Sequence, residues 1–491
     1  MHYYMNPFEF VPLPVNGPRE IPTTVARGTP TLEGYLTYSL TTLTPLHITG
    51  KTTKENNHFE KKSFYENYGK KVIPGSSLRG MIASFVEAFT GSDLGAFTRG
   101  DEKSKYGKHY DENNAQKCRH VGFLMASADD PIEAKSEPDE YTYRGQTKKR
   151  CRYERNETLP PRFGRHIVDD AARFLFGFVD QENEGNEKAK AGRLIFEDLI
   201  IPENVKMINP PVWGLKGDAV FGSPNPRANT AWYFTPGESR VRKTDRGFRV
   251  WEILADKVRG RKFYFHQDPK ACHEEYLKWQ RKWLPDLTEY NVEAVESGAA
   301  IANGRIYFRD LPETMLTLLA YSLMLPEMNM AHKLGALKPF GFGSVKIEVD
   351  GLFYRDMANP LKPIESQGLK GKLVGSLINQ VSYRFLKKIM HFPEDGEEKD
   401  YLFIYPPFNP GGKTSEEKGF AVVERVYDRH LAPGNVNRSN CSVKLTATSP
   451  PGHPTPGKSK KTTLFFDHYQ RNAKNFKKVM GGTNYAHLLN P

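Results

Sequence analysis

The stretch VIPGSSLRG at residues 72–80 constrains the fold more than any other part of this sequence. Its Pro-Gly pair predicts a turn after a strand, because proline presets φ and glycine accepts a positive φ. Ser76 or Ser77 is then expected to cap a helix by accepting hydrogen bonds from its first N–H groups. The apolar residues that follow recur at helical spacing: Met81, Ile82, Phe85, Val86 and Phe89. Free N–H groups, two hydroxyls and Arg79 favour a bound phosphate at this helix start, although an ordinary capped turn explains the same residues.

A second constraint is the glycine-rich segment HKLGALKPFGFGSV at residues 332–345. It lies between an expected helix at 311–325 and an expected strand at 345–349. Glycines let a backbone approach a ligand closely, lysines suit phosphates, and aromatic rings suit stacked bases. A glycine-rich loop alone is a weak signal, but its combination with residues 72–80 is specific.

The two segments resemble those of the RAMP superfamily of CRISPR-associated proteins. In that family "IPGSSLRG" opens the first helix, and a late glycine-rich loop precedes the last strand of a ferredoxin-like, RRM-type domain. Residues 172–177 and 191–198 resemble the family's "LFG … GRL.F.D" pattern, and residues 6–13 resemble the start of a large subfamily of type III systems, particularly III-D. The resemblance covers roughly residues 6–350, with gaps.

The resemblance implies an α+β fold and a role in binding CRISPR guide RNA. The partners implied are the guide RNA, target RNA, neighbouring RAMP subunits and the large subunit of a type III complex. The residues expected to contact RNA are His47, Lys51, Ser76, Ser77, Arg79, Lys333, Gly335, Lys338, Phe340, Gly341 and Gly343.

The charge balance agrees with an anionic partner, since 70 lysines and arginines outnumber 58 aspartates and glutamates. The sequence has no apolar run of the ~18–20 residues that a membrane span needs. The N-terminus lacks the pattern of a signal peptide, and four scattered cysteines are too few for a disulfide framework. A cytoplasmic protein without a membrane partner is therefore expected.

The composition predicts three regions. Residues 1–30 are proline-rich and are expected to form an extended arm, which either crosses a neighbouring subunit or is disordered. Residues 31–356 are expected to form the RRM-like domain, with insertions at about 100–160 and 209–291, and residues 357–491 an extension of unknown fold. The expected strands are 32–43, 193–199, 304–309, 345–349, 401–405 and 420–426, and further helices are expected at 167–177 and 375–392.

Residues 51–69 are expected to form a polar loop. In cutting relatives the corresponding loop, after an "LHIG" signature like residues 46–50, carries a catalytic aspartate, but this sequence has no aspartate between residues 50 and 74. Glu60 and His58 are the candidates to replace it, because cleavage by a 2′-hydroxyl needs a group that organises a metal or moves a proton. The absence favours a subunit that holds RNA without cutting it.

Both insertions carry further candidate sites. In the first, a zinc site is a hypothesis, although the spacing of the four possible ligands matches no standard motif and unliganded side chains are the simpler interpretation. These ligands are His109, Cys118, His120 and Cys151. The second insertion holds every tryptophan of the chain among arginines, which is typical of a single-strand-binding thumb, while burial of the tryptophans in a core is the alternative. The thumb candidates are Trp232, Tyr233, Arg240 and Arg242.

Two other functions remain as alternatives to a scaffold that holds guide RNA. One is an active, metal-dependent endoribonuclease of the same complex, or an enzyme that processes the guide. The other is a stand-alone RRM-like protein, against which the sequence lacks the linear aromatic pattern of an RNP motif.

Overall fold

The computed structural model describes residues 3–5, 7–14, 18–21, 31–55, 58–93, 108–110, 139–143, 146–151, 170–179, 189–215, 218–219, 239–243, 249–253, 260–282, 287–369, 371, 373–393 and 401–403. The chain divides into two compact units. The first comprises Met1–Asp93, Val168–Phe221 and Arg261–Tyr405, and the second Leu94–Ile167, Gly222–Gly260 and Pro406–Pro491. The extension expected after residue 356 is thus shared between the units.

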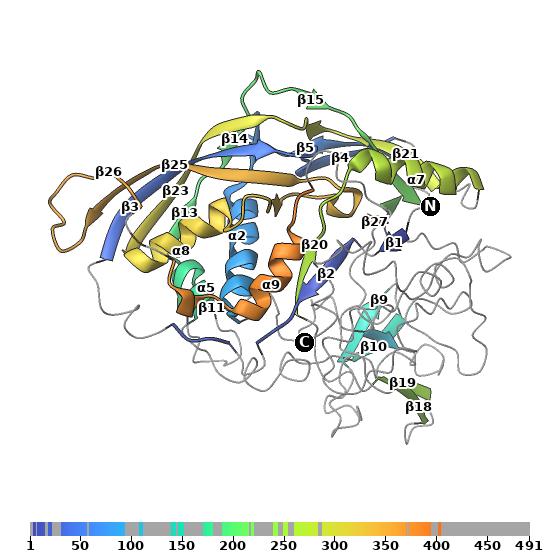
Figure 1. Cartoon of the computed structure of the whole chain (residues 1–491). Helices are drawn as coiled ribbons and strands as arrows, with labels where there is room; N and C mark the ends of the chain where they lie inside the picture. Colours follow the sequence, from blue (N-terminus) through green and yellow to red (C-terminus); the bar gives the residue numbers. More distant parts are fainter. Residues whose placement is uncertain are drawn as a thin grey trace. The chain divides into compact units, whose positions relative to one another are not determined.

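The first unit is built on an antiparallel sheet in which the strand order is β13-β23-β3-β25-β24, with β26 added beside β25. The strands are β3 (Thr31–Thr42), β13 (Leu194–Phe196), β23 (Ala300–Pro312), β24 (His332–Lys333), β25 (Ser344–Asp356) and β26 (Glu365–Gln367). Helix α2 (Gly75–Thr90) follows β3 in the chain, helix α8 (Glu313–Met324) follows β23, and both lie on one face of the sheet (Figure 1). This is the split β-α-β arrangement, in which each helix links two strands that are separated by a third. The α+β class predicted from the sequence is therefore confirmed.

Alternation of side chains explains why one face of the sheet is the core. Every second residue of β3 is buried, among them Leu36, Tyr38 and Leu40, as the sequence predicted. These side chains face the helices, where Phe85 of α2 and Leu319 of α8 are also buried. The other face of β3 is half-buried throughout.

The segment predicted as a polar loop at 51–69 contains a hairpin, and that prediction was wrong. Strands β4 (Thr49–Glu55) and β5 (His58–Phe64) pair with each other, and β5 pairs in parallel with β21 (Leu287–Val292). The partner strand is more than 200 residues away, so the lysine- and threonine-rich hairpin has no apolar pattern of its own to reveal it. The sheet is completed by β16 (Pro211–Leu215) and β17 (Asp218–Ala219).

The described parts of the N-terminal arm pair with strands of its own chain. Strand β1 (Tyr3–Met5) runs parallel to β27 (Tyr401–Phe403), and β2 (Phe8–Val11) pairs with β20 (Arg261–Tyr264). Phe8 is buried in this pairing, which explains why a proline-rich segment is held in place.

The first unit contains further strands, which are short, and further helices. The strands are β6 (Glu66–Asn67), β7 (Lys70–Ile73), β11 (Phe178–Val179), β12 (Ala189–Lys190), β14 (Leu199–Ile200), β15 (Met207–Ile208) and β22 (Ala294–Val295). The helices are α5 (Ala171–Phe176), α7 (Pro269–Lys282), α9 (Gln380–Ile389) and the 3-10 turns η2 (Lys338–Phe340) and η3 (Gly375–Leu377). Helix α9 confirms the helix expected at 375–392, although it begins later and ends earlier than predicted.

In the second unit the described residues form two small sheets. One has the order β8-β10-β9, from β8 (Lys108–Tyr110), β9 (Asp139–Tyr143) and β10 (Gln146–Cys151). The other is the hairpin of β18 (Ser239–Lys243) and β19 (Arg249–Ile253). The strand expected at 420–426 lies outside the described residues. Across the described residues of both units, none of the helices combines the length and the apolar character needed to cross a bilayer.

Candidate nucleic-acid interface

Helix α2 begins at Gly75, and the residue that caps it comes from elsewhere in the chain. Pro74 occupies the cap position, while the Gly75 N–H donates a hydrogen bond of 2.8 Å to Oδ1 of Asp198. The prediction that a serine caps the helix was therefore wrong, because a distant carboxylate reaches the helix start. The hydroxyls of Ser76 and Ser77, in the first turn, have no hydrogen-bond partner among the described residues.

The glycine-rich segment folds back on residues 46–48 and requires its glycines for close contact. Gly335 has a φ of +77°, and a Cβ there would lie 2.4 Å from the carbonyl oxygen of His47. Gly343 has a φ of +75°, and a Cβ there would lie 1.9 Å from the carbonyl oxygen of Leu334. The Lys333 ammonium donates hydrogen bonds of 2.9 Å to the carbonyl oxygens of residues 341 and 342. Lys333 thus holds the loop in shape.

The aromatic residues of this segment belong to the core. Phe340 is 3% exposed and Phe342 is 2% exposed, in a cluster with Trp213 and Tyr276. The Trp213 Nε1–H donates a hydrogen bond of 3.1 Å to Nδ1 of His273. Phe340 is therefore not placed to stack on a base. Trp213 is buried in the core, which agrees with the alternative interpretation of the tryptophans.

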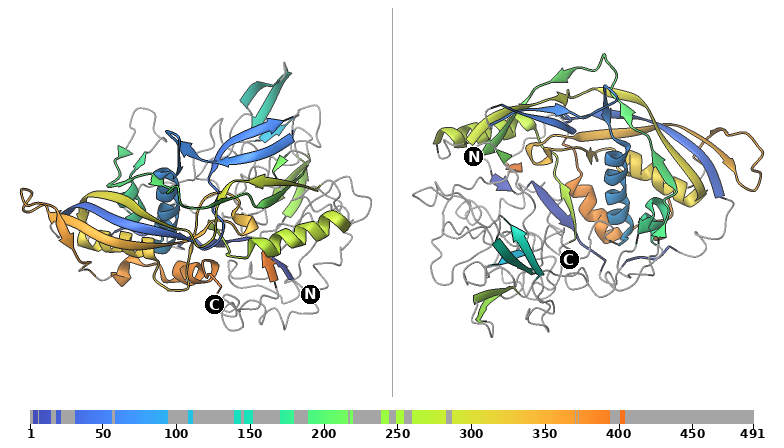
Figure 2. Two further views of the ribbon diagram at one scale, coloured as in Figure 1. Left: turned by 90° about the horizontal axis from the view of Figure 1, so that it is seen from above. Right: turned by 180° about the vertical axis from the view of Figure 1, so that it is seen from behind.

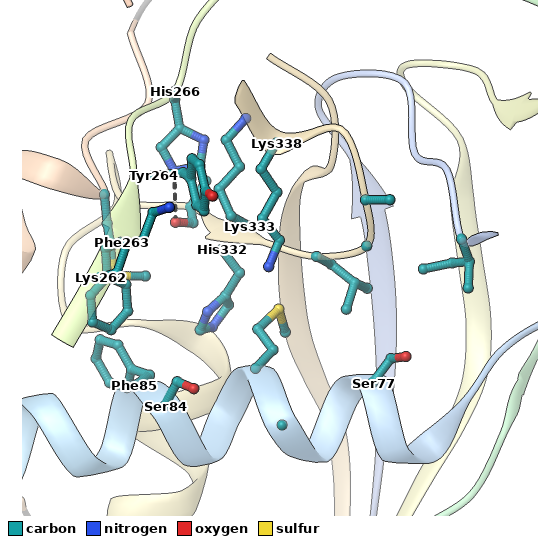
Figure 3. Close-up of a pocket in the computed structure, with 18 of the residues that line it drawn as sticks. Ser77, Ser84, Phe85, Lys262, Phe263, Tyr264, His266, His332, Lys333 and Lys338 are labelled. Carbon is teal, nitrogen blue, oxygen red and sulfur yellow. Dashed lines mark hydrogen bonds between the residues drawn. The ribbon is translucent and has the colours of Figure 1, made fainter. Parts of the chain in front are cut away.

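Both segments line one cavity of about 490 Å³ between α2 and the glycine-rich loop (Figure 3). Of the residues expected to contact RNA, the cavity brings together five: Ser76, Ser77, Lys333, Gly335 and Lys338. Strand β20 and the residues after it contribute Lys262, Tyr264 and His266 to the same cavity. No pattern in the sequence singles out these three residues as part of the site, because they are distant in the chain from both α2 and the glycine-rich loop.

Lys338 has the most unusual environment in this cavity. Its half-buried ammonium makes no hydrogen bond or ion pair with a described residue, and its side chain extends from the loop toward α2 (Figure 3). Burial lowers the pKa of Lys338 from 10.5 to about 8. At neutral pH the cavity therefore contains a positive charge that has no counterion among the described residues.

The two histidines of the cavity are structural. The His332 ring is buried, interacts through Nε2 with the Leu323 carbonyl oxygen at 3.0 Å, and has its pKa lowered to about 4 by burial. The His266 ring is also buried, with Nδ1 at 2.8 Å from Oγ of Ser344. Both rings fix the strands that carry the loop.

Five other expected contact residues lie away from the cavity. The Arg79 guanidinium donates a hydrogen bond of 2.5 Å to the Phe176 carbonyl oxygen, so it joins α2 to α5. The His47 ring is buried with Nδ1 at 2.7 Å from the Glu293 carbonyl oxygen, and burial lowers its pKa. Lys51 is exposed on β4, and Gly341 and Gly343 shape the loop without lining the cavity.

Several candidates lie outside the described residues or side chains. Trp232, Tyr233, Cys118 and His120 lie outside the described residues. Only the backbone is described for Glu60 and His58 on β5, Arg240 and Arg242 on β18, His109 on β8 and Cys151 on β10. Among the side chains that are described, no group of three or more histidines, cysteines, aspartates or glutamates is placed to hold a metal ion.

Comparison with known proteins identifies one family. Residues 39–346 match the family model described as "RAMP superfamily", a span that contains both α2 and the glycine-rich loop. No curated protein sequence matches the chain. The family implies a ferredoxin-like core, with which the order β13-β23-β3-β25 agrees.

Proposed function

The chain belongs to the RAMP superfamily, and from that premise we propose that it is a backbone subunit of a type III CRISPR effector complex, which holds guide RNA and presents it to target RNA without cutting it. Membership of the family implies a CRISPR-associated, RNA-binding protein. The backbone role, the type III assignment and the absence of cutting are the finer parts of the proposal.

The observation that carries the proposal is the charge of Lys338 beside the first turn of α2, which pairs with no carboxylate in the described part of the chain. A phosphate of the guide would supply the missing negative charge, and the hydroxyls of Ser76 and Ser77 would donate hydrogen bonds to it. Such contacts read the RNA backbone and not the base sequence, which suits a subunit that must accept any guide.

Some residues around the cavity shape the loop, and others are placed to contact RNA. Gly335 lies against the His47 carbonyl oxygen, and Lys333 donates hydrogen bonds to the carbonyl oxygens of residues 341 and 342. Both residues thus shape the loop that carries Lys338 at the cavity. Substitutions at Lys333 or Gly335 would deform the loop, and a loss of RNA binding in such variants would not identify a contact. Lys338 and Ser77 are the informative positions.

The first experiment is to purify the full chain from its native complex and to sequence the RNA that copurifies. A repeat-tagged guide is expected. A mixed population of cellular RNA would overturn the guide-binding role.

The second experiment compares Lys338→Met with the wild type for RNA affinity at several salt concentrations. Loss of one phosphate contact should lower the slope of log affinity against log salt by about 1, equally for guides of different sequence. Lys70→Met is the matched control, because Lys70 is exposed on β7 and does not line the cavity. Unchanged affinity and slope in a folded Lys338→Met variant would refute the assignment.

A further inference from the structure

The face of the central sheet that points away from the helices carries a row of aromatic rings from three strands. Tyr307 of β23 and Phe353 of β25 are each directly opposite Tyr35 of β3 in the strand register. The ring centroids of Tyr35 and Phe353 are 4.9 Å apart and stacked, and those of Tyr35 and Tyr307 are 5.8 Å apart. We call Tyr307, Tyr35 and Phe353 the aromatic row.

The alternation of each strand shows that the row points outward. Ile306 and Phe308, on either side of Tyr307, are buried, and so are Leu352 and Tyr354 on either side of Phe353. The rings of the row itself are only half-buried. Helices α2 and α8 cover the opposite face, and the left view of Figure 2 looks down on the strands with the helices beneath them.

Two exposed arginines flank the row on β23. The Arg305 guanidinium lies 5.1 Å from the ring centroid of Tyr35, and its Nη1 donates a hydrogen bond of 3.0 Å to the Tyr307 hydroxyl. Arg309 is exposed two positions beyond Tyr307. Neither arginine lies within salt-bridge distance of a carboxylate among the described residues.

Mutual packing across strands accounts for part of this arrangement, because aromatic pairs stabilise sheets. It does not account for exposed arginines beside half-exposed rings, which form no ion pair with a carboxylate in the described part of the chain. Rings that bind bases, with cations that bind phosphates, are the composition of surfaces that hold single-stranded nucleic acid. Ile195, directly opposite Tyr307 and 61% exposed, extends the same surface to a fourth strand.

We propose that the aromatic row is a second RNA site, which stacks unpaired bases of single-stranded RNA while Arg305 and Arg309 contact its phosphates. The row lies on the opposite face of the sheet from α2, whose first turn lines the cavity, so the two sites can be tested separately. The proposal does not require the cavity to bind guide RNA.

The test measures binding of the RNA-free full chain to a labelled single-stranded oligoribonucleotide, to the same oligonucleotide with abasic positions, and to an RNA duplex. Tyr35→Val and Phe353→Val remove a ring each and keep a residue that favours strands. Each should weaken binding of the single strand by about fivefold or more, with little effect on the abasic strand or the duplex. Tyr35→Trp, which keeps an aromatic ring at this position, should bind the single strand about as well as the wild type does.

The salt dependence separates the two kinds of contact. The valine variants should leave the slope of log affinity against log salt unchanged, whereas Arg305→Gln should lower it by about 1. Tyr68→Asn is the control, because Tyr68 is 99% exposed in the turn between β6 and β7, away from the row, and asparagine tolerates its φ of +48°. Far-UV circular dichroism checks that each variant is folded.

The proposal is overturned if the folded valine variants bind single-stranded RNA as the wild type does, or lose equal affinity for the abasic strand. It is also overturned if they keep RNA binding and instead lose association with another protein. Failure of the cavity proposal has a different result: Lys338→Met would leave RNA affinity unchanged while the valine variants still lost discrimination between the intact and abasic strands.

Discussion

Removing the Arg261 guanidinium should destabilise the first unit more than most single substitutions. Arg261 is 8% exposed at the start of β20, and its Nη1 forms an ion pair with Glu87 of α2. Its Nη2 donates a hydrogen bond of 2.8 Å to the Asp93 carbonyl oxygen. The Asp93 carboxylate in turn pairs with Arg173, whose N–H donates a hydrogen bond of 2.9 Å to Oδ1 of Asp170. All three segments of the first unit meet in this buried cluster.

The expected loss in the free energy of unfolding follows from the buried charge that each single substitution leaves without its partner. Arg261→Met keeps much of the volume but leaves Glu87 buried without this partner, and breaking a buried pair in this way costs about 3–5 kcal/mol of unfolding free energy. Glu87→Leu alone should cost a similar amount. The double variant should lose less than the sum, because it removes both charges and replaces them with apolar groups.

The assay is thermal unfolding of the full chain and of the three variants, followed by calorimetry. A loss of this size should lower the midpoint of the transition that reports the first unit by roughly 6–20 °C. Arg261→Lys is the matched control, and it should give an intermediate loss because an ammonium cannot reach both Glu87 and the Asp93 carbonyl oxygen as a guanidinium does. A variant Arg261→Met within about 1 kcal/mol of the wild type, or a double variant whose loss equals the sum of the two single losses, would refute the reasoning.

Three further predictions concern titration and cleavage. RNA affinity should fall as the pH rises above about 8, because Lys338 loses its proton there, and Lys338→Arg should bind without this dependence. Affinity measured from pH 7 to 10 tests this, and the same pH dependence in both proteins would contradict it. Because burial lowers the pKa of His332 to about 4, its contribution to the free energy of unfolding is fully present above pH 6.5 and is lost as the pH falls toward 4, by about 3 kcal/mol in all. Denaturant unfolding of His332→Gln should therefore depend less on acid pH than unfolding of the wild type does. Target RNA should stay intact opposite this subunit in the assembled complex, so Glu60→Ala and His58→Ala should leave the pattern of cuts unchanged; loss of one cut would show that this subunit is a nuclease.

The sequence was sufficient to predict an element where the pattern of apolar residues within one segment decides its structure. The alternation of Leu36, Tyr38 and Leu40 predicted β3 and its buried face, and helical spacing predicted α2, α8 and α9. The two motifs also pointed to elements that the structure places around one cavity. Their resemblance to known segments indicated the family before any contact was known.

The tertiary structure alone decided which side chains are available to a ligand. Phe340 and Arg79 have the chemistry of RNA contacts, but Phe340 is enclosed in the core and Arg79 is bound to the Phe176 carbonyl oxygen. The partners in these contacts are separated by tens to hundreds of residues, and periodicity within a segment carries no information about them. The aromatic row is hidden for the same reason, since Tyr35, Tyr307 and Phe353 become neighbours only through the register of three strands. The sequence thus determined the main elements of the central sheet and the family, while the pairing of distant strands determined which candidate residues line the cavity and which hold the fold.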